Sequence, residues 1–301
     1  MKGILIVAML FVSTLAFSQS KIIEGGGAGS YKAIAITDAS FPGYTIYRPQ
    51  NLQSVVSETN LPLIVFANGG CTNSNLPFEN YLNEIASFGY VIVAVGPLHL
   101  SVDEMMNDTD SRTQMPPAML IEAINIMEKC NEDPSSEFYH KMDMSSIAVM
   151  GQSCGGVQAI AVSSDPRITT TICLNSGVIN NREGTDSKFA SSLLATKDDL
   201  RKIHSPILYV IGGESDIAYP NAMDDYSRLN NVFVSMASFD VGHGGTYSER
   251  YGGSFASITL QWLEWHLKNK PWMGSIFNGE ECICQYPGWS VIFKNEQYLK
   301  K

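Results

Sequence analysis

Residues 146–163 read SIAVMGQSCGGVQAIAVS, and this stretch decides the fold. The apolar run at 146–150 is typical of a strand that is buried on both faces of a sheet. A turn bracketed by glycines follows it, and the next apolar segment predicts a helix that extends to about Ser163. The stretch is therefore a strand, a tight turn and a helix, with Ser153 at the centre of the turn.

The same alternation of strand and helix continues on both sides of this stretch. Short apolar runs predict further buried strands at 61–67, 90–95, 169–174, 206–211 and 232–237. Helical patterns occur between them at 77–88, 115–130, 191–203, 219–229 and 254–268. This order predicts an α/β fold, with a mostly parallel, doubly wound sheet and helices on both faces.

The remaining segments are predicted to lie outside this parallel core. Residues 31–49 alternate in polarity and predict one or two antiparallel strands, whereas the Gly-rich stretch 21–30 predicts a flexible tail. Residues 175–190 are polar and irregular, which fits either a small lid or a loop. The end of the chain, about 274–301, is predicted to be a short tail with two close cysteines and one strand-like segment.

The first residues have the pattern of a targeting segment. Residues 1–18 contain one lysine, then about a dozen mostly apolar residues, then small residues that fit a cleavage site after Ser18. This pattern is typical of a secretory signal peptide, and the apolar run is short for the alternative, a membrane anchor. We expect residues 19–301 to form a single exported domain, secreted or periplasmic, with no membrane span.

Composition excludes several classes of function. The chain has 301 residues, is 45% hydrophobic and carries a formal net charge of −10. Hydrophobic content of this size argues against a disordered chain. The acid excess argues against nucleic-acid binding and against docking on an anionic membrane, since both depend on cationic contacts. We therefore expect a neutral or non-anionic substrate. We also expect the protein to be a monomer.

The turn at 151–155, GQSCG, fits the pattern G-x-S-x-G. In this pattern a serine lies on a strained turn between a strand and a helix, which lifts its hydroxyl above the sheet. Glycines are needed two residues before and after it, because neighbouring chain passes close there. The strand before the turn and the helix after it favour this interpretation over an ordinary Gly-rich turn.

A serine hydroxyl is a weak nucleophile and needs a general base that is oriented by an acid. In this architecture the acid and then the histidine follow the serine along the chain, each on a loop after a strand. His243 lies in such a loop and is the predicted base. Asp216 follows the strand at 206–211 and is the predicted acid, with Glu214 as the alternative.

Other polar residues are assigned lesser roles. His204 and His266 lie in helical positions, and His99, after the strand at 90–95, is a candidate substrate contact. Asp224 and Asp225 are predicted to be solvated residues of a helix.

Catalysis at such a serine also needs two N–H donors for the developing oxyanion. The N–H of Cys154 is one candidate, and the N–H of Gly70, in the Gly-rich loop after the strand at 61–67, is the other. Cys71 and Cys154 each adjoin one of these donors. We therefore hypothesise a Cys71–Cys154 disulfide that ties the loop to the turn, the alternative being two small buried thiols.

Taken together, these segments resemble the α/β-hydrolase superfamily, and in particular secreted esterases related to dienelactone hydrolases, cutinases and polyester hydrolases. The resemblance covers about residues 60–270 and rests on the strings VFANGGC, EIASFGYVIVAVG, SSIAVMGQSCGGVQAI, LYVIGGESDIAYPNA, DVGHGGTY and WLEWHLK. It implies an α/β-hydrolase fold of about eight strands and a triad of Ser153, Asp216 and His243. Cutinase-like enzymes usually carry Met or Gln where this chain has Cys154, and dienelactone hydrolases carry Cys where it has Ser153.

The sequence thus predicts an exported serine hydrolase that cleaves carboxylic esters through an acyl-enzyme, without a metal or cofactor. The ester is either a small molecule or a polymer. The alternatives are a serine peptidase or another acyl hydrolase on the same fold, and a non-catalytic binding protein. Tyr219, Tyr247 and Trp272 are candidates either for the pocket lining or for packing.

Overall fold

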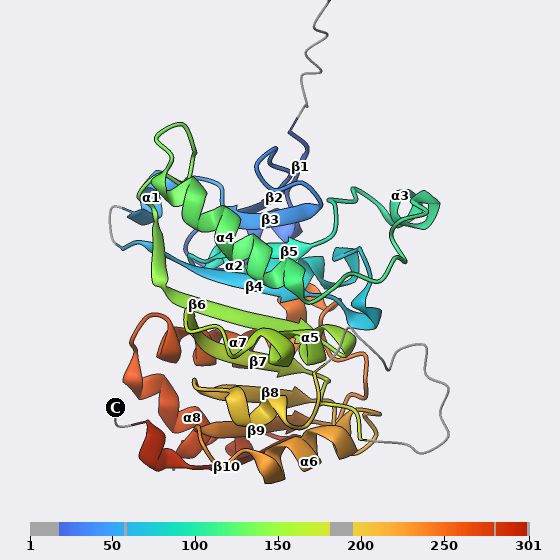
Figure 1. The fold of residues 1–301 in the computed structure, drawn as a ribbon, viewed down its shortest axis with the longest axis vertical. Coiled ribbons are helices and arrows are strands. Elements are labelled where there is room, and N and C mark those ends of the chain that lie inside the picture. The colour runs from blue at the N-terminus through green and yellow to red at the C-terminus, as the bar shows by residue number, and fades with distance from the viewer. Residues whose placement is uncertain (1–17, 57–58, 181–194, 280, 300–301) are drawn as a thin grey trace, which may run out of the picture.

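The apolar runs assemble into one sheet (Figure 1). The computed structural model describes residues 18–56, 59–180, 195–279 and 281–299, and in these ranges the sheet has ten strands in the order β1-β2-β3-β5-β4-β6-β7-β8-β9-β10. The parallel strands are β4 (Leu61–Ala67), β5 (Val91–Val95), β6 (Met142–Gln152), β7 (Ile168–Leu174), β8 (Ile207–Ile211) and β9 (Val234–Phe239). The antiparallel strands are β1 (Ser20–Lys21), β2 (Ala33–Ile36), β3 (Tyr44–Pro49) and β10 (Trp289–Lys294).

The predicted number of about eight strands is too low. β1 has only two residues, too few to leave a periodic pattern in the sequence. β10, predicted to be part of a tail, pairs antiparallel with β9 along six residues and extends the sheet at its other edge. Both additions are edge strands. β1 is too short to be recognised from its sequence, and β10 pairs with β9, a strand that is distant from it in sequence.

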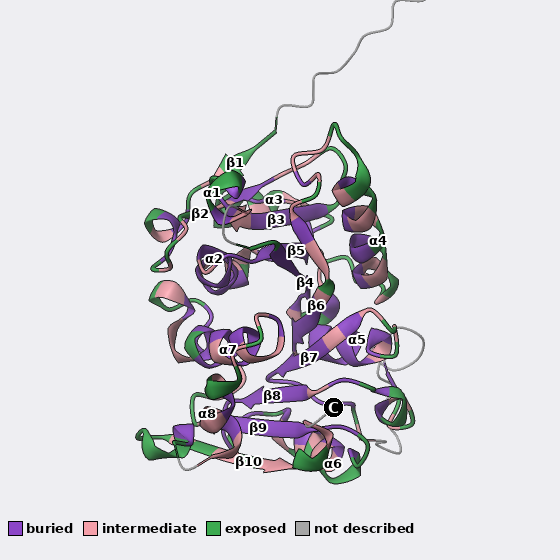
Figure 2. Ribbon diagram, turned by 90° about the vertical axis from the view of Figure 1, so that its left-hand side faces the viewer, coloured by how far each residue is buried: buried purple, intermediate pink, exposed green. Residues whose placement is uncertain are grey.

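Helices cover both faces of the sheet (Figure 2). α2 (Glu79–Ser87) and α7 (Gly253–His266) pack on one face. α4 (Ala118–Glu132), α5 (Cys154–Val162) and α6 (Tyr219–Arg228) pack on the other. The short helices α1 (Leu52–Val56), α3 (Val102–Asn107) and α8 (Ser275–Asn278) complete the described set.

Not every predicted segment falls within the described residues. The signal peptide at 1–18 lies outside them except for Ser18, and so do 181–190 of the irregular segment. The helix predicted at 191–203 is wrong where it can be compared, because 195–203 contain only a 3₁₀ turn at Asp199–Lys202. None of the helices within the described ranges combines the length and apolar character needed to cross a membrane.

The Gly-rich stretch 21–30 is not a flexible tail. The N–H of Ala28 donates to the Glu84 carboxylate at 2.8 Å, and the N–H of Gly29 donates to the Ser87 hydroxyl at 2.9 Å. A Cβ at Gly29 would overlap the Ser87 carbonyl, so glycine lets the leader approach α2 closely. Ile23 is buried in the core beside α2. Small residues here therefore serve packing.

This packing predicts a cost for a single methyl group. Gly29→Ala should lower the free energy of unfolding by about 1–3 kcal/mol, because the added Cβ pushes the leader off α2. Ala28→Ser, at an exposed position of the same segment, should change it by less than about 0.5 kcal/mol. Urea unfolding followed by circular dichroism measures both. Equal urea midpoints for Gly29→Ala and the wild type would contradict this packing and support the prediction of a flexible tail.

Candidate active site

Ser153 occupies a strained turn between β6 and α5. Its backbone has φ 52° and ψ −118°, a region that residues other than glycine rarely adopt. A Cβ at Gly151 would overlap the backbone of Gly155, and one at Gly155 would overlap the carbonyl of Ala67 at the end of β4. The turn therefore requires glycine at both positions. It places Ser153 at the carboxyl end of the parallel strand β6.

The three residues predicted to act together lie within hydrogen-bond distance of one another. His243 Nε2 is 2.9 Å from Ser153 Oγ, and His243 Nδ1 is 2.6 Å from Asp216 Oδ1. They follow β6, β8 and β9, whose carboxyl ends meet at one edge of the sheet. In this geometry the imidazole can accept the Ser153 proton, while Asp216 holds the opposite ring nitrogen. The alternative acid, Glu214, is exposed to solvent and belongs to a different cavity.

Asp216 is buried, and its carboxylate is fully hydrogen-bonded. Besides His243, it accepts from Ala218 N–H at 2.9 Å, from Gly212 N–H at 3.1 Å and from Asn175 Nδ2 at 2.6 Å. Burial raises the pKa of Asp216, but the hydrogen bonds, led by that from His243, outweigh it and hold the pKa below its usual value. The carboxylate therefore stays ionised and can stabilise an imidazolium.

The predicted oxyanion donors line the same pocket as Ser153 and His243. Cys154 is the first residue of α5, so its N–H has no acceptor within the helix and lies at the positive end of the helix dipole. Gly70 lies in the 3₁₀ turn Gly69–Cys71 with φ 63°, a conformation that suits glycine. The structure thus brings both residues to one wall of the pocket.

Gln152 is a site residue that the sequence analysis missed. Its Nε2 donates to the carbonyl of His243 at 3.1 Å, and its Oε1 fills the space that a side chain at Gly69 would need. The side chain thus lies between the loop after β4, which contains Gly69 and Gly70 (the oxyanion loop), and the loop that carries His243 (the histidine loop). The motif treats this position as variable, and only the three-dimensional neighbourhood reveals its contacts.

Cys71 and Cys154 lie at disulfide distance, as hypothesised. Their Cα atoms are 5.1 Å apart, within the range of about 4.4–6.8 Å that disulfides require. The bond links the oxyanion loop to the first turn of α5 across 83 residues of sequence. Cys130 and Cys173 are buried free thiols.

The pocket beside Ser153 has a volume of about 270 Å³ and mainly apolar walls. The apolar side chains that line it are Val157, Ile179, Ile217 and Ala218. Within the described part of the chain, no Asp, Glu, Lys or Arg side chain lines it. The pocket therefore suits an uncharged, largely apolar group.

The aromatic candidates for the lining do not reach this pocket. Tyr247 is buried and packs edge-on against Phe78 and Tyr81. Tyr219 lines another cavity, and Trp272 is 66% exposed on a 3₁₀ turn. The sequence left open whether these aromatic residues line the pocket or pack in the core. Tyr247 packs in the core.

His99 also lies outside the pocket lining. Its side chain is buried between Ser74, 3.3 Å from Nδ1, and Asp108, 3.0 Å from Nε2. The predicted substrate contact is therefore wrong for this structure, and the ring instead links the chain before α3 to the oxyanion loop.

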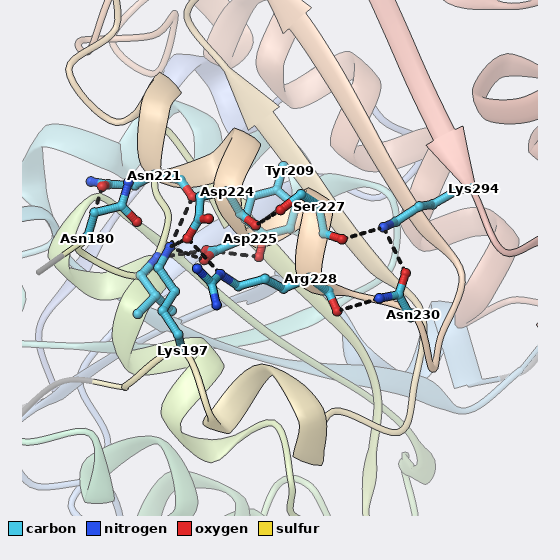
Figure 3. Close-up of polar contacts among 11 residues, drawn as sticks. Asn180, Lys197, Tyr209, Asn221, Asp224, Asp225, Ser227, Arg228, Asn230 and Lys294 are labelled. Atoms are coloured by element: carbon cyan, nitrogen blue, oxygen red, sulfur yellow. Dashed lines mark hydrogen bonds and ion pairs between the residues drawn. The ribbon is translucent and has the colours of Figure 1, made fainter.

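The outer wall of the pocket, residues 176–180, is held by α6 (Figure 3). Val178 N–H donates to Asp225 at 2.7 Å, and Asn180 N–H donates to the Asn221 side chain at 3.1 Å. Lys197 pairs with Asp225 at 2.6 Å from the other side. Asp225 is fully buried, so the prediction of a solvated residue is wrong for it. Its burial depends on Lys197, which is distant in sequence.

Comparison with known proteins supplies no family. No protein-family model matches the chain, and no curated protein matches it. Across the described residues, no three His, Cys, Asp or Glu side chains gather where they could hold a metal ion. The basis for assigning a function is therefore the geometry of Ser153, His243 and Asp216 beside an apolar pocket.

The disulfide predicts a loss of stability when it is removed. The double variant Cys71→Ser/Cys154→Ser should unfold with a free energy about 2–4 kcal/mol lower, because the unfolded chain is no longer cross-linked. Chemical unfolding without reductant measures the change. Dithiothreitol should destabilise the wild type more than the double variant, in which only the local Cys282–Cys284 pair remains to be reduced. A wild type that is indifferent to reductant would show that the two thiols are not bonded.

The carboxyl of Asp225 predicts a pH effect on stability. Burial raises its pKa to about 6, and Lys197 only partly offsets this. Between about pH 4 and pH 6 the folded protein then holds a proton that the unfolded chain has released. The contribution of Asp225 to the free energy of unfolding therefore falls as pH rises. Asp225→Asn removes that loss. The stability of Asp225→Asn relative to the wild type should therefore increase from pH 4 to pH 7.

Asp224 supplies the control for this experiment. Its hydrogen bonds to Arg228 and Lys197 lower its pKa to about 2, so its contribution is present above the unfolded pKa and lost as pH falls. Asp224→Asn should therefore lose stability relative to the wild type as pH rises from 2 to 4. Thermal unfolding across pH 2–8 compares the three proteins. If the stability difference between Asp225→Asn and the wild type did not change with pH, the raised pKa of the buried Asp225 carboxyl would be contradicted.

Proposed function

We propose that the protein is a serine hydrolase that cleaves carboxylic esters. The observation that carries the proposal is the hydrogen-bonded series Ser153–His243–Asp216, with distances of 2.9 and 2.6 Å, beside an apolar pocket. Serine, acid and histidine follow one another along the chain in the order that α/β-hydrolases use. We also propose that fold for the chain, with β2 to β9 as its eight strands and β1 and β10 as edge additions.

The geometry supports acyl transfer in two steps. His243 Nε2 takes the proton of Ser153 as Oγ attacks the ester carbonyl carbon. The carbonyl oxygen becomes an oxyanion, for which the N–H groups of Cys154 and Gly70 are the proposed donors. When the C–O bond breaks, His243 returns the proton to the departing alcohol. Water then attacks the acyl-enzyme with the same base and releases the acid and Ser153.

The pocket supports an ester over a charged substrate. Among the described residues, no Asp, Glu, Lys or Arg side chain lines its walls, so an ionic acyl group would lose its hydration without compensation. The substrate is therefore a neutral ester, small or polymeric. The intact triad geometry favours this proposal over a non-catalytic binding protein.

We also propose that the protein is exported. The signal-like pattern at 1–18 and the disulfide-distance pair Cys71–Cys154 both support this, because disulfides persist in oxidising compartments.

Replacement of the nucleophile tests the proposal. Ser153→Ala should lower turnover of p-nitrophenyl acetate by at least about 10³-fold, because it removes the hydroxyl that His243 Nε2 contacts. A fluorophosphonate probe should label the wild type and fail to label the variant. Ser163→Ala, a buried serine at the other end of α5, is the matched control and should keep both properties. Turnover that survives Ser153→Ala would refute the assignment.

A further inference from the structure

Asn175 lies between the acid loop and the histidine loop. It directly follows β7, and its own N–H donates to the carbonyl of Val210 on β8 at 2.7 Å, which fixes its backbone. Its φ is 44°, in the left-handed region where asparagine is one of the few tolerated residues. This conformation accompanies a side chain that is fully buried beside Asp216.

The Asn175 side chain connects three separate parts of the site. Nδ2 donates to Asp216 Oδ2 at 2.6 Å and to the carbonyl of Gly242 at 3.1 Å. Oδ1 accepts a hydrogen bond from the hydroxyl of Tyr247. Both amide hydrogens and the amide oxygen are therefore used, which satisfies the hydrogen-bonding groups of this buried side chain. One side chain thus joins the acid to the loop that carries the base.

Tyr247 determines which end of the amide faces the acid. Burial raises the pKa of its hydroxyl well above the usual value, so the group keeps its proton and donates it. The donated bond holds Oδ1 of Asn175 toward Tyr247 and leaves Nδ2 toward Asp216. Reversal of the amide would place its oxygen against the carboxylate, and two acceptors in contact repel each other.

We propose that Asn175 and Tyr247 are positioning residues that hold Asp216 and the His243 loop in the arrangement the proposed hydrolysis needs. Asp216 has two oxygens, and only Oδ1 meets His243. Asn175 and Gly212 N–H hold Oδ2, which sets the plane of the carboxylate and hence the direction of the bond to the imidazole. The proposal rests on the proposed serine-hydrolase function.

Two variants test the proposal by kinetics. Asn175→Gly removes the side chain and keeps a residue that suits the positive φ, and Tyr247→Phe removes only the hydroxyl. With p-nitrophenyl acetate, kcat should fall by about 10- to 100-fold for Asn175→Gly and by a smaller factor for Tyr247→Phe. KM should stay within about twofold for Tyr247→Phe, because Tyr247 does not line the substrate pocket, whereas Asn175 does.

Matched variants separate positioning from general loss of stability. Asn83→Ala removes a buried asparagine that donates to Ile23, and Tyr90→Phe removes a buried hydroxyl that donates to Glu264. Neither residue lines the pocket or hydrogen-bonds to Ser153, His243 or Asp216, and kcat should stay within about twofold of the wild type. Equal losses of kcat in these controls would mean that Asn175 acts only through stability, which would overturn the proposal.

A measurement that does not depend on turnover keeps the two proposals distinguishable. The His243 Nδ1 proton, hydrogen-bonded to Asp216, should give a downfield proton NMR signal that is absent in His243→Gln. The signal should broaden or disappear in Asn175→Gly and stay in Asn83→Ala. An unchanged signal in Asn175→Gly would overturn the positioning role. Absence of Ser153-dependent turnover in the wild type, with the signal lost in Asn175→Gly, would instead refute only the hydrolase function.

Discussion

The close contact between the first turn of α5 and the end of β4 is the constraint on which the site depends. Gly155 lies so near the carbonyl of Ala67 that no side chain fits between them. This contact bends the chain at Ser153 into its strained conformation. It also brings the loop that follows β4 beside the start of α5, so Gly70 and Cys154 meet at one pocket. The Cys71–Cys154 pair, which is at disulfide distance, lies between the same loop and helix.

The parallel core could be predicted because burial on both faces leaves an unmistakable run of apolar residues. β4 was predicted at 61–67 and is found at Leu61–Ala67, and β7 and β8 agree within one residue. The main site residues could also be predicted, since G-x-S-x-G fixes the serine and parallel strands deliver the later loops to the same edge. Local pattern and global topology point to the same answer there.

The remaining features depend on contacts that one segment of sequence does not contain. Nothing near Gly29 indicates that α2 will pack on it, so the leader resembled a linker. Asp225 has the composition of a surface residue and is buried only because Lys197 and the Val178 N–H reach it. The sequence around Asn175 likewise does not indicate its role, because its partners Asp216 and Tyr247 lie 41 and 72 residues later in the chain. A polar side chain can be buried where hydrogen-bond partners satisfy it, and only the fold brings those partners together.

The way in which α6 holds the pocket wall has a consequence for how the shape of the pocket could change. Val178 and Asn180 are held through their main-chain N–H groups, which every residue except proline possesses. Between them, Ile179 contributes its side chain to the pocket and takes no part in those bonds. The frame of the wall is thus separate from its surface. Divergent selection can exchange the side chain at position 179 and reshape the pocket while the scaffold stays in place.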